Sequence, residues 1–169
     1  MPGMKPFIKW AGGKGQILPW IEKMLPRQIG NYFEPFIGGG AVFFRLASLG
    51  LIRDAVINDS NPHLAVAYRM VRDCPQSLIS ALESLREAHG KEHYYAARER
   101  FNNADLSDLE RAALLIYLNK TCYNGLYRVN KSGGFNVPFG TYRNPRIVKP
   151  GQIQACSAAL KHAEIECGD

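Results

Sequence analysis

Residues 31–40 constrain the fold more than any other stretch, because aromatic and β-branched residues there lead into three consecutive glycines. An apolar periodic run follows at 41–49, so the order predicts a strand, a tight turn and a helix. Glycines at such a turn let the backbone approach a ligand closely, and the helix N-terminus offers unpaired N–H groups. A second β-like run ends at Asp59, about 20 residues after the glycines, where an acidic residue can bind ribose hydroxyls in a nucleotide-binding βαβ unit.

The totals describe an ordinary globular chain. Its 169 residues, 46% hydrophobic and 21% charged, are enough for one domain or slightly more. The cysteines form no CxxC pair and no metal-like spacing with the four histidines, so we predict no metal site and reduced thiols, as in a cytosolic protein. The N-terminus resembles no signal peptide, and no apolar run approaches the roughly 20 residues of a membrane span, which predicts a cytoplasmic protein with no membrane partner. The cysteines are Cys74, Cys122, Cys156 and Cys167.

The net charge of +6 comes from a single segment. Between Tyr117 and Lys149 there are six basic residues and no acidic one, while the other 15 basic residues are balanced by 15 acidic ones. Six aromatic residues are interleaved, and positive charge combined with stacking surfaces is typical of nucleic-acid binding. The alternative is a solvated basic face with a few core aromatics. The basic residues are Lys120, Arg128, Lys131, Arg143, Arg146 and Lys149, and the aromatic ones are Tyr117, Tyr123, Tyr127, Phe135, Phe139 and Tyr142.

Periodicity and capping signals predict a mixed α/β chain. A capping box, Ser107-x-x-Glu110, starts one helix, and Asn61-Pro62 is a cap followed by proline at the first helical position. Short β-like pieces at 127–129 and 135–137 flank a Lys-Ser-Gly-Gly turn and suggest a hairpin. Helices are also predicted at 16–25, 62–72, 75–89, 92–101 and 152–160, and a final β-like piece at 163–167.

Two nucleotide-binding readings fail on particular residues. A P-loop needs a glycine where Ile8 stands and a hydroxyl where Gly15 stands. A dinucleotide site needs a third glycine where Phe43 stands, and phenylalanine would crowd a pyrophosphate. The loop therefore suits an adenosine ligand without phosphates, of which S-adenosylmethionine (SAM) is the common one. Lys14 could bind its carboxylate and Trp10 could pack against it, although a core anchor is the alternative for Trp10.

Five motifs occur in order along the chain: residues 9–14 (Lys-Trp-Ala-Gly-Gly-Lys), 33–40, Asp59, 123–126 (Tyr-Asn-Gly-Leu) and 135–140 (Phe-Asn-Val-Pro-Phe-Gly). Together they resemble the Dam-type, class α DNA adenine-N6 methyltransferases. The resemblance implies a partial Rossmann-like SAM-dependent methyltransferase core with an inserted helical DNA-recognition domain carrying a β-hairpin. It divides the chain into a SAM-binding part at 1–60, a target-recognition domain at 61–147 with its hairpin near 126–138, and a return to the core at 148–169.

The resemblance also implies roles for particular residues. Tyr123 and Asn124 match residues that contact or intercalate DNA, and Arg128 can donate two hydrogen bonds to guanine. Thr141 departs from relatives that carry arginine there, and the family's usual site, GATC, is the expected target in double-stranded DNA. The cofactor-binding residues are expected to be Trp10, Gly12, Gly13, Lys14, Pro35, Phe36, Gly38, Gly40 and Asp59. The DNA-binding residues are expected to be Lys120, Tyr123, Asn124, Leu126, Arg128, Pro138, Tyr142 and Arg143.

No catalytic residue is predicted within the chain. Such enzymes flip adenine out of the duplex and hold its amino group with an Asp-Pro-Pro-Tyr loop, which these residues lack. The nearest tetrapeptide, at 136–139, has valine in place of the first proline and falls in the expected hairpin. We therefore expect a truncated methyltransferase of bacterial or phage type, inactive alone, or alternatively a non-catalytic DNA-binding module derived from one. The sequence leaves the oligomeric state open, and also the choice between a restriction–modification and a housekeeping role.

Overall fold

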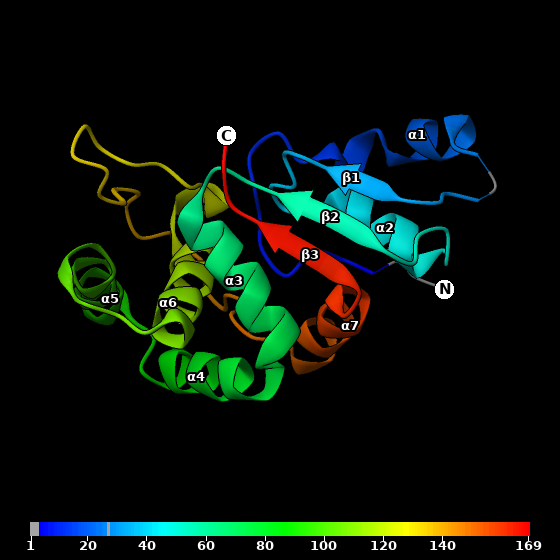
Figure 1. Ribbon diagram of the computed structural model, residues 1–169. Coiled ribbons are helices and arrows are strands. Elements are labelled where there is room, and N and C mark those ends of the chain that lie inside the picture. Colours follow the sequence, from blue (N-terminus) through cyan, green and yellow to red (C-terminus); the bar gives the residue numbers. More distant parts are fainter. Residues whose placement is uncertain (1–3, 27) are drawn as a thin grey trace.

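A small parallel sheet forms one side of the molecule. The structure, a computed structural model, describes residues 4–26 and 28–169. The sheet it describes has the order β1-β2-β3, with β1 (Tyr32–Glu34) and β3 (Ala163–Glu166) both pairing parallel to β2 (Ala55–Asn58) (Figure 1). The predicted strand, turn and helix at the glycine cluster are confirmed, since β1 is followed by a tight loop and α2 (Ala41–Ser48).

One face of the sheet is covered and the other is open. Helices α2 and α7 (Pro150–Leu160) pack against each other beneath the strands. Ile57, in the central strand, is fully buried on the covered face. The opposite face presents Phe33, which is 65% exposed, and Glu164, which is exposed as well. Because successive strand residues point to opposite faces, the strands alternate between core and solvent rather than being apolar throughout.

Four helices between β2 and α7 build the larger side of the molecule. The central one, α6 (Asp108–Thr121), packs against α3 (Pro62–Asp73), α4 (Pro75–Glu87) and α5 (Lys91–Asn103). Both predicted caps are present. The Asn61 side chain accepts from two backbone N–H groups at the start of α3, and Ser107 and Glu110 form the reciprocal capping box of α6. These local signals placed the helix starts to within a residue or two.

The N-terminal helix differs from its prediction. It begins at Leu18 rather than at residue 16, as α1 (Leu18–Met24), after a separate 3-10 turn η1 (Lys14–Gln16). Pro19 lies in its first turn, where its missing N–H costs no helical hydrogen bond. Its apolar residues do not enter the core, since Met24 is 86% exposed and Ile21 lines a cavity described below.

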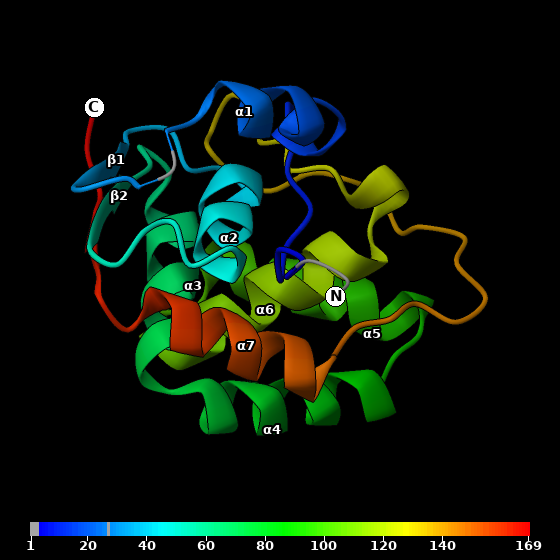
Figure 2. The same cartoon turned by 90° about the vertical axis from the view of Figure 1, so that its right-hand side faces the viewer.

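The predicted hairpin is present, but neither of its arms is a regular strand. The arms at 127–129 and 135–137 run antiparallel and share one isolated bridge, between Val129 and Phe135. Asn130 closes the turn by accepting from the backbone N–H groups of Ser132 and Gly134. The segment, yellow to orange in Figures 1 and 2, lies on the α5 and α6 side of the molecule.

A continuous buried cluster joins the sheet, the helices and the hairpin. It includes Ile57 of β2, Tyr68 of α3, Leu115 of α6, Phe135 of the hairpin and Leu160 of α7. Helix α3, in the predicted recognition domain, packs against α7, in the predicted return to the core, so the predicted boundary at residue 147 is crossed by packing. The division into 1–60, 61–147 and 148–169 therefore stays a prediction about origin and role.

None of the helices in the described ranges is both long and apolar enough to cross a membrane. The four cysteines are all free thiols. Cys122 and Cys156 are buried, and burial raises the pKa of Cys122 to about 11 and that of Cys156 to about 12. Cys74 and Cys167 are exposed.

Candidate functional site

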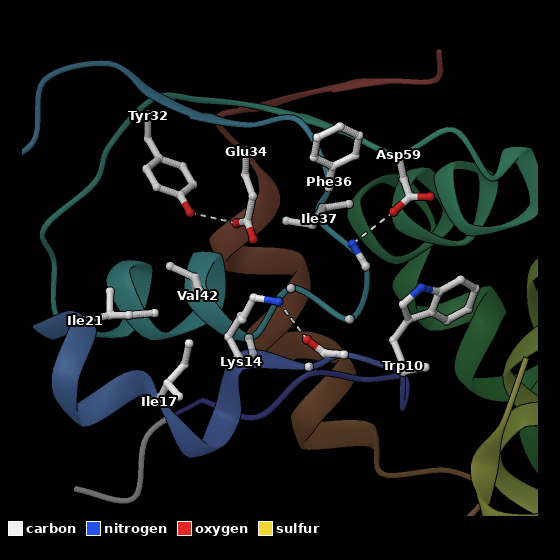
Figure 3. A pocket seen from close by; sticks show the side chains of 17 residues that line it. Trp10, Lys14, Ile17, Ile21, Tyr32, Glu34, Phe36, Ile37, Val42 and Asp59 are labelled. Atoms are coloured by element: carbon white, nitrogen blue, oxygen red, sulfur yellow. Dashed lines mark hydrogen bonds between the residues drawn. The ribbon is translucent and has the colours of Figure 1, made fainter. Parts of the chain in front are cut away.

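A cavity of about 440 Å³ lies at the carboxyl ends of β1 and β2, beside the N-terminus of α2 (Figure 3). This edge is where open α/β sheets bind ligands. Of the nine residues predicted to bind a cofactor, eight line the cavity: Trp10, Gly12, Gly13, Lys14, Phe36, Gly38, Gly40 and Asp59. Pro35 does not line it, and its carbonyl oxygen accepts a hydrogen bond from Asn58 instead.

The glycine loop is held in a conformation that side chains would oppose. Gly38 and Gly40 have φ of +50° and +74°, in the left-handed region that favours glycine. A Cβ on Gly38 would lie 2.9 Å from Cδ1 of Trp10, and one on Gly40 would lie 2.6 Å from the hydroxyl of Tyr68. That hydroxyl donates a 2.9 Å hydrogen bond to the Gly38 carbonyl, so Tyr68 both packs against the loop and holds it by a hydrogen bond, while Gly38, Gly39 and Gly40 line the cavity.

Asp59 both lines the cavity and fixes the loop. One carboxylate oxygen accepts from the Gly38 N–H at 3.0 Å, and the other accepts from the Asn61 N–H at 3.0 Å. A carboxylate offers about four lone-pair positions, so these two bonds leave further acceptor capacity toward the cavity. Its position is thus compatible with binding ribose hydroxyls, and that role stays a prediction.

Glu34 is a second cavity carboxylate, to which the sequence reasoning gave no role. It ends β1, and one of its oxygens accepts a 2.7 Å hydrogen bond from the hydroxyl of Tyr32. Burial raises the pKa of Glu34, while the Tyr32 hydroxyl, the Phe43 backbone N–H and the charge of Lys14 oppose that rise. The available signal was positional: Glu34 is the last strand residue before the turn, and such residues face the ligand edge of a parallel sheet.

Lys14 and Trp10 lie at different ends of the cavity. In Figure 3 the Lys14 ammonium and the Glu34 carboxylate point into the same part of it, and Trp10 stands near Asp59. The Lys14 ammonium donates a 3.0 Å bond to the Gly12 carbonyl. Trp10 also stacks on Tyr127 of the hairpin, with ring centroids 5.0 Å apart and an interplanar angle of 25°. Trp10 therefore serves both predicted alternatives, since it lines the cavity and also packs against the core.

The residues predicted to bind DNA lie at the surface around the hairpin. Seven are exposed, and Lys120 is half-buried. The Tyr123 N–H donates a 2.9 Å bond to the Pro138 carbonyl, so these two residues are adjacent. Asn124 adopts a left-handed φ of +54°, which asparagine tolerates better than most residues. The exposed residues are Tyr123, Asn124, Leu126, Arg128, Pro138, Tyr142 and Arg143.

Comparison with known proteins defines the family. The sequence model for D12 class N6 adenine-specific DNA methyltransferases matches residues 10–169, almost the whole chain. The chain belongs to this family.

Curated relatives of this D12 class chain are also named as methyltransferases or as a DNA adenine methylase. It is 47% identical to the type II methyltransferase M.MjaIII of Methanocaldococcus jannaschii, over 98% of this chain and 62% of that protein. It is 43% identical to the type II methyltransferase M1.LlaDCHI of Lactococcus lactis subsp. cremoris, over 96% of this chain and 57% of that protein. It is 36% identical to a DNA adenine methylase of Vibrio cholerae, over 86% of this chain and 51% of that protein. The chain thus spans little more than half the length of these relatives.

Four cationic side chains gather around a second cavity of this D12 class chain. Lys9, Lys120, Arg146 and Lys149 line a cavity of about 280 Å³ together with Tyr142, and the Lys9 ammonium lies 5.4 Å from the Tyr142 ring centroid. Burial, followed by the charges of Lys9 and Lys149, lowers the pKa of Lys120 to about 8. An anion entering this cavity would relieve that repulsion.

Of the six interleaved aromatics of this segment, two are buried, two are half-buried and two are exposed. Tyr117 and Phe135 are buried core residues, so for them the alternative interpretation was right. Tyr123 is 54% exposed and Tyr142 is 39% exposed, so both could stack on bases. Within the tetrapeptide at 136–139, Val137 is buried and its carbonyl oxygen accepts a bond from Tyr94.

Proposed function

We propose that this chain provides the SAM site and the DNA-reading surface of a site-specific DNA adenine-N6 methyltransferase. The observation that carries the proposal is the cavity at the glycine loop, which is lined by Lys14, by the carboxylates Glu34 and Asp59, and by apolar side chains. A zwitterionic adenosine ligand fits that arrangement better than a nucleotide does. Two carboxylates beside the α2 N-terminus would repel phosphates, whereas they suit ribose hydroxyls and a cationic amino acid tail.

The individual contacts follow from the chemistry of each side chain. Lys14 would pair with the carboxylate of SAM, Asp59 would accept from its ribose hydroxyls, and Trp10 would pack against it. Glu34 places negative charge where the amino acid tail would lie. When bound, SAM supplies an electrophilic methyl group, and the adenine N6 of duplex DNA is its acceptor in this family.

For DNA, we propose that the hairpin reads base edges in the major groove. Arg128 is the residue best suited to guanine, since arginine can donate to both O6 and N7. A GATC-like site is the expected target. Tyr123 and Asn124 would contact DNA around the flipped base, and the cluster beside Lys120 would contact phosphates. Because its substrate is cellular or phage DNA, the protein would act in the cytoplasm.

We further propose that the 169 residues bind both ligands without turning them over, because they contain no Asp-Pro-Pro-Tyr. Calorimetry with S-adenosylhomocysteine and fluorescence anisotropy with adenine-containing duplexes test the two binding steps. Methyl transfer from labelled SAM tests turnover. DNA binding without cofactor binding would instead favour the non-catalytic module, and robust turnover by this chain would contradict its expected inactivity.

A matched pair of variants makes the cofactor test specific. Asp59→Asn should weaken S-adenosylhomocysteine binding by about 10- to 100-fold, as expected for losing hydrogen bonds to a charged group. Asp54→Asn, an exposed change at the other end of β2, should leave the affinity unchanged. Equal affinities for the two variants would place the cofactor elsewhere.

A further inference from the structure

The guanidinium of Arg128 is held by the opposite arm of the hairpin although the side chain is exposed. Its Nε donates a 2.7 Å hydrogen bond to the side-chain oxygen of Asn136. Its Nη2 donates a 3.2 Å bond to the backbone carbonyl of the same residue. The Asn136 N–H in turn donates a 3.0 Å bond to the Arg128 carbonyl, which fixes the two residues opposite each other.

These two hydrogen bonds to Asn136 determine which N–H donors of Arg128 are left for a ligand. A guanidinium has five N–H donors in a rigid fork, and Asn136 uses Nε and one hydrogen of Nη2. The two Nη1 hydrogens and the second Nη2 hydrogen are left, so the end of the fork still offers two parallel donors. Guanine presents two acceptors in the major groove, O6 and N7, whereas adenine presents one acceptor and one donor. The two end donors of the guanidinium therefore match the two acceptors of guanine, whereas on adenine one of them would face the N6 donor.

Helix α5 fixes the arm that carries Asn136. The Asn102 side chain donates a 3.0 Å bond to the Phe135 carbonyl and accepts a 2.8 Å bond from the Phe135 N–H. On the other side of Asn136, the Val137 carbonyl accepts from the hydroxyl of Tyr94 at 2.8 Å and from Arg98 at 3.3 Å.

The three α5 residues are spaced four apart, so they form one stripe on the helix. Their side chains supply hydrogen bonds that a neighbouring strand would supply in a sheet. The hairpin lacks a regular ladder of its own, and this stripe replaces it.

We propose that Asn136, supported by Asn102, is a positioning residue that presents Arg128 end-on to a guanine and thereby sets base selectivity. This inference rests on the proposed function, in which Arg128 reads a base. Pre-ordering adds selectivity because the side chain does not have to be immobilised when DNA binds, and because the edge it offers is already chosen.

The experiment measures discrimination rather than affinity alone. The tightest duplex is selected by the chain from a random library, and each guanine in it is replaced in turn by inosine, 7-deazaguanine or adenine. Inosine keeps both O6 and N7, 7-deazaguanine lacks N7, and adenine lacks O6. At one position the wild-type chain should tolerate inosine and reject the other two. Arg128→Ala should abolish that discrimination, and Asn136→Ala should reduce it by about 3- to 10-fold.

A double-mutant cycle separates positioning from general stability. Adding Asn136→Ala to Arg128→Ala should cause no further loss of discrimination, since no guanidinium is left to orient. Asn136→Asp keeps a side-chain oxygen for Nε and should retain the guanine preference, with weaker binding to all duplexes alike. Asn102→Ala should act in the same direction as Asn136→Ala. Ser132→Ala in the hairpin turn and Asn103→Ala beside Asn102 are the matched controls.

The outcomes distinguish this inference from the proposed function. If Arg128→Ala loses discrimination while Asn136→Ala keeps all of it, the positioning role is wrong and base reading by Arg128 stands. If Asn136→Ala weakens every duplex equally, its role is structural only and the inference is also wrong. If Arg128→Ala itself keeps full discrimination, the proposed base reading fails first.

Discussion

Asn119 ties the N-terminal segment to the end of α6 through a side chain that is 1% exposed. Its oxygen accepts a 3.0 Å bond from the Lys9 N–H, and its nitrogen donates to the Lys9 carbonyl at 2.9 Å and the Gly125 carbonyl at 3.0 Å. Asn119→Ala removes all three bonds. At about 1 kcal/mol for each net hydrogen bond, the free energy of unfolding should fall by about 3 kcal/mol.

Urea denaturation followed by circular dichroism measures this loss. With a slope of about 2 kcal/mol/M, the midpoint should drop by about 1.5 M. Asn119→Asp should cost at least as much, because it keeps an acceptor but buries a charge and removes both donated bonds. Asn103→Ala is the control: its side chain is exposed and, among the residues that the structure describes, bonds only to Glu99 of the same helix, so its change should stay within about 0.5 kcal/mol. A loss below about 1 kcal/mol for Asn119→Ala, with an unchanged slope, would refute the role assigned to this cross-link.

Three further predictions concern the cavity and the cation cluster. Gly40→Ala should destabilise the fold by about 1–3 kcal/mol or more in urea titrations, because alanine is strained at the left-handed φ and its Cβ would clash with Tyr68. Gly151→Ala is the control, since a Cβ there meets no neighbouring atom, and equal effects of the two substitutions would contradict the prediction. Glu34→Gln should raise the thermal midpoint at pH 7, because the pKa of Glu34 is raised in the folded state and its ionised form therefore destabilises the fold. The gain should fade as the pH drops toward the ordinary pKa of 4.5, and a gain independent of pH would argue against this reasoning. DNA affinity should weaken as the pH rises through about 8, where Lys120 loses its proton. For Lys120→Arg, fluorescence anisotropy should show DNA affinity that depends less on pH, because arginine stays protonated, and identical pH profiles for the two proteins would show that Lys120 does not contact DNA.

Local chemistry explains what could be predicted from the sequence. Caps such as Asn61 and the Ser107–Glu110 box act within one helical turn, so they mark helix starts without knowledge of the fold. The glycine loop is also local, because the order of strand, glycines and helix already specifies a turn at the carboxyl edge of a sheet. Eight of the nine predicted cofactor residues accordingly line one cavity.

The misses involve contacts between residues far apart in the chain. In α1, Ile21 lines the cavity and Met24 is 86% exposed, a difference that periodicity cannot predict. Tyr117 and Tyr123 carry the same kind of ring, yet one is buried and the other is 54% exposed, since burial depends on what packs around each.

The sequence by itself determined the order of elements, the glycine turn, the location of the excess charge and the family to which the motifs belong. The tertiary structure decided how the side chains are used. In the tertiary structure Glu34 lines the cavity, and Asp59 both lines the cavity and accepts a hydrogen bond from the glycine loop. Asn102 supplies Phe135, 33 residues away, with hydrogen bonds that a neighbouring strand would otherwise make. The physical reason is that hydrogen-bond partners and burial are set by distance in space, which capping and periodicity report only over a few neighbouring residues.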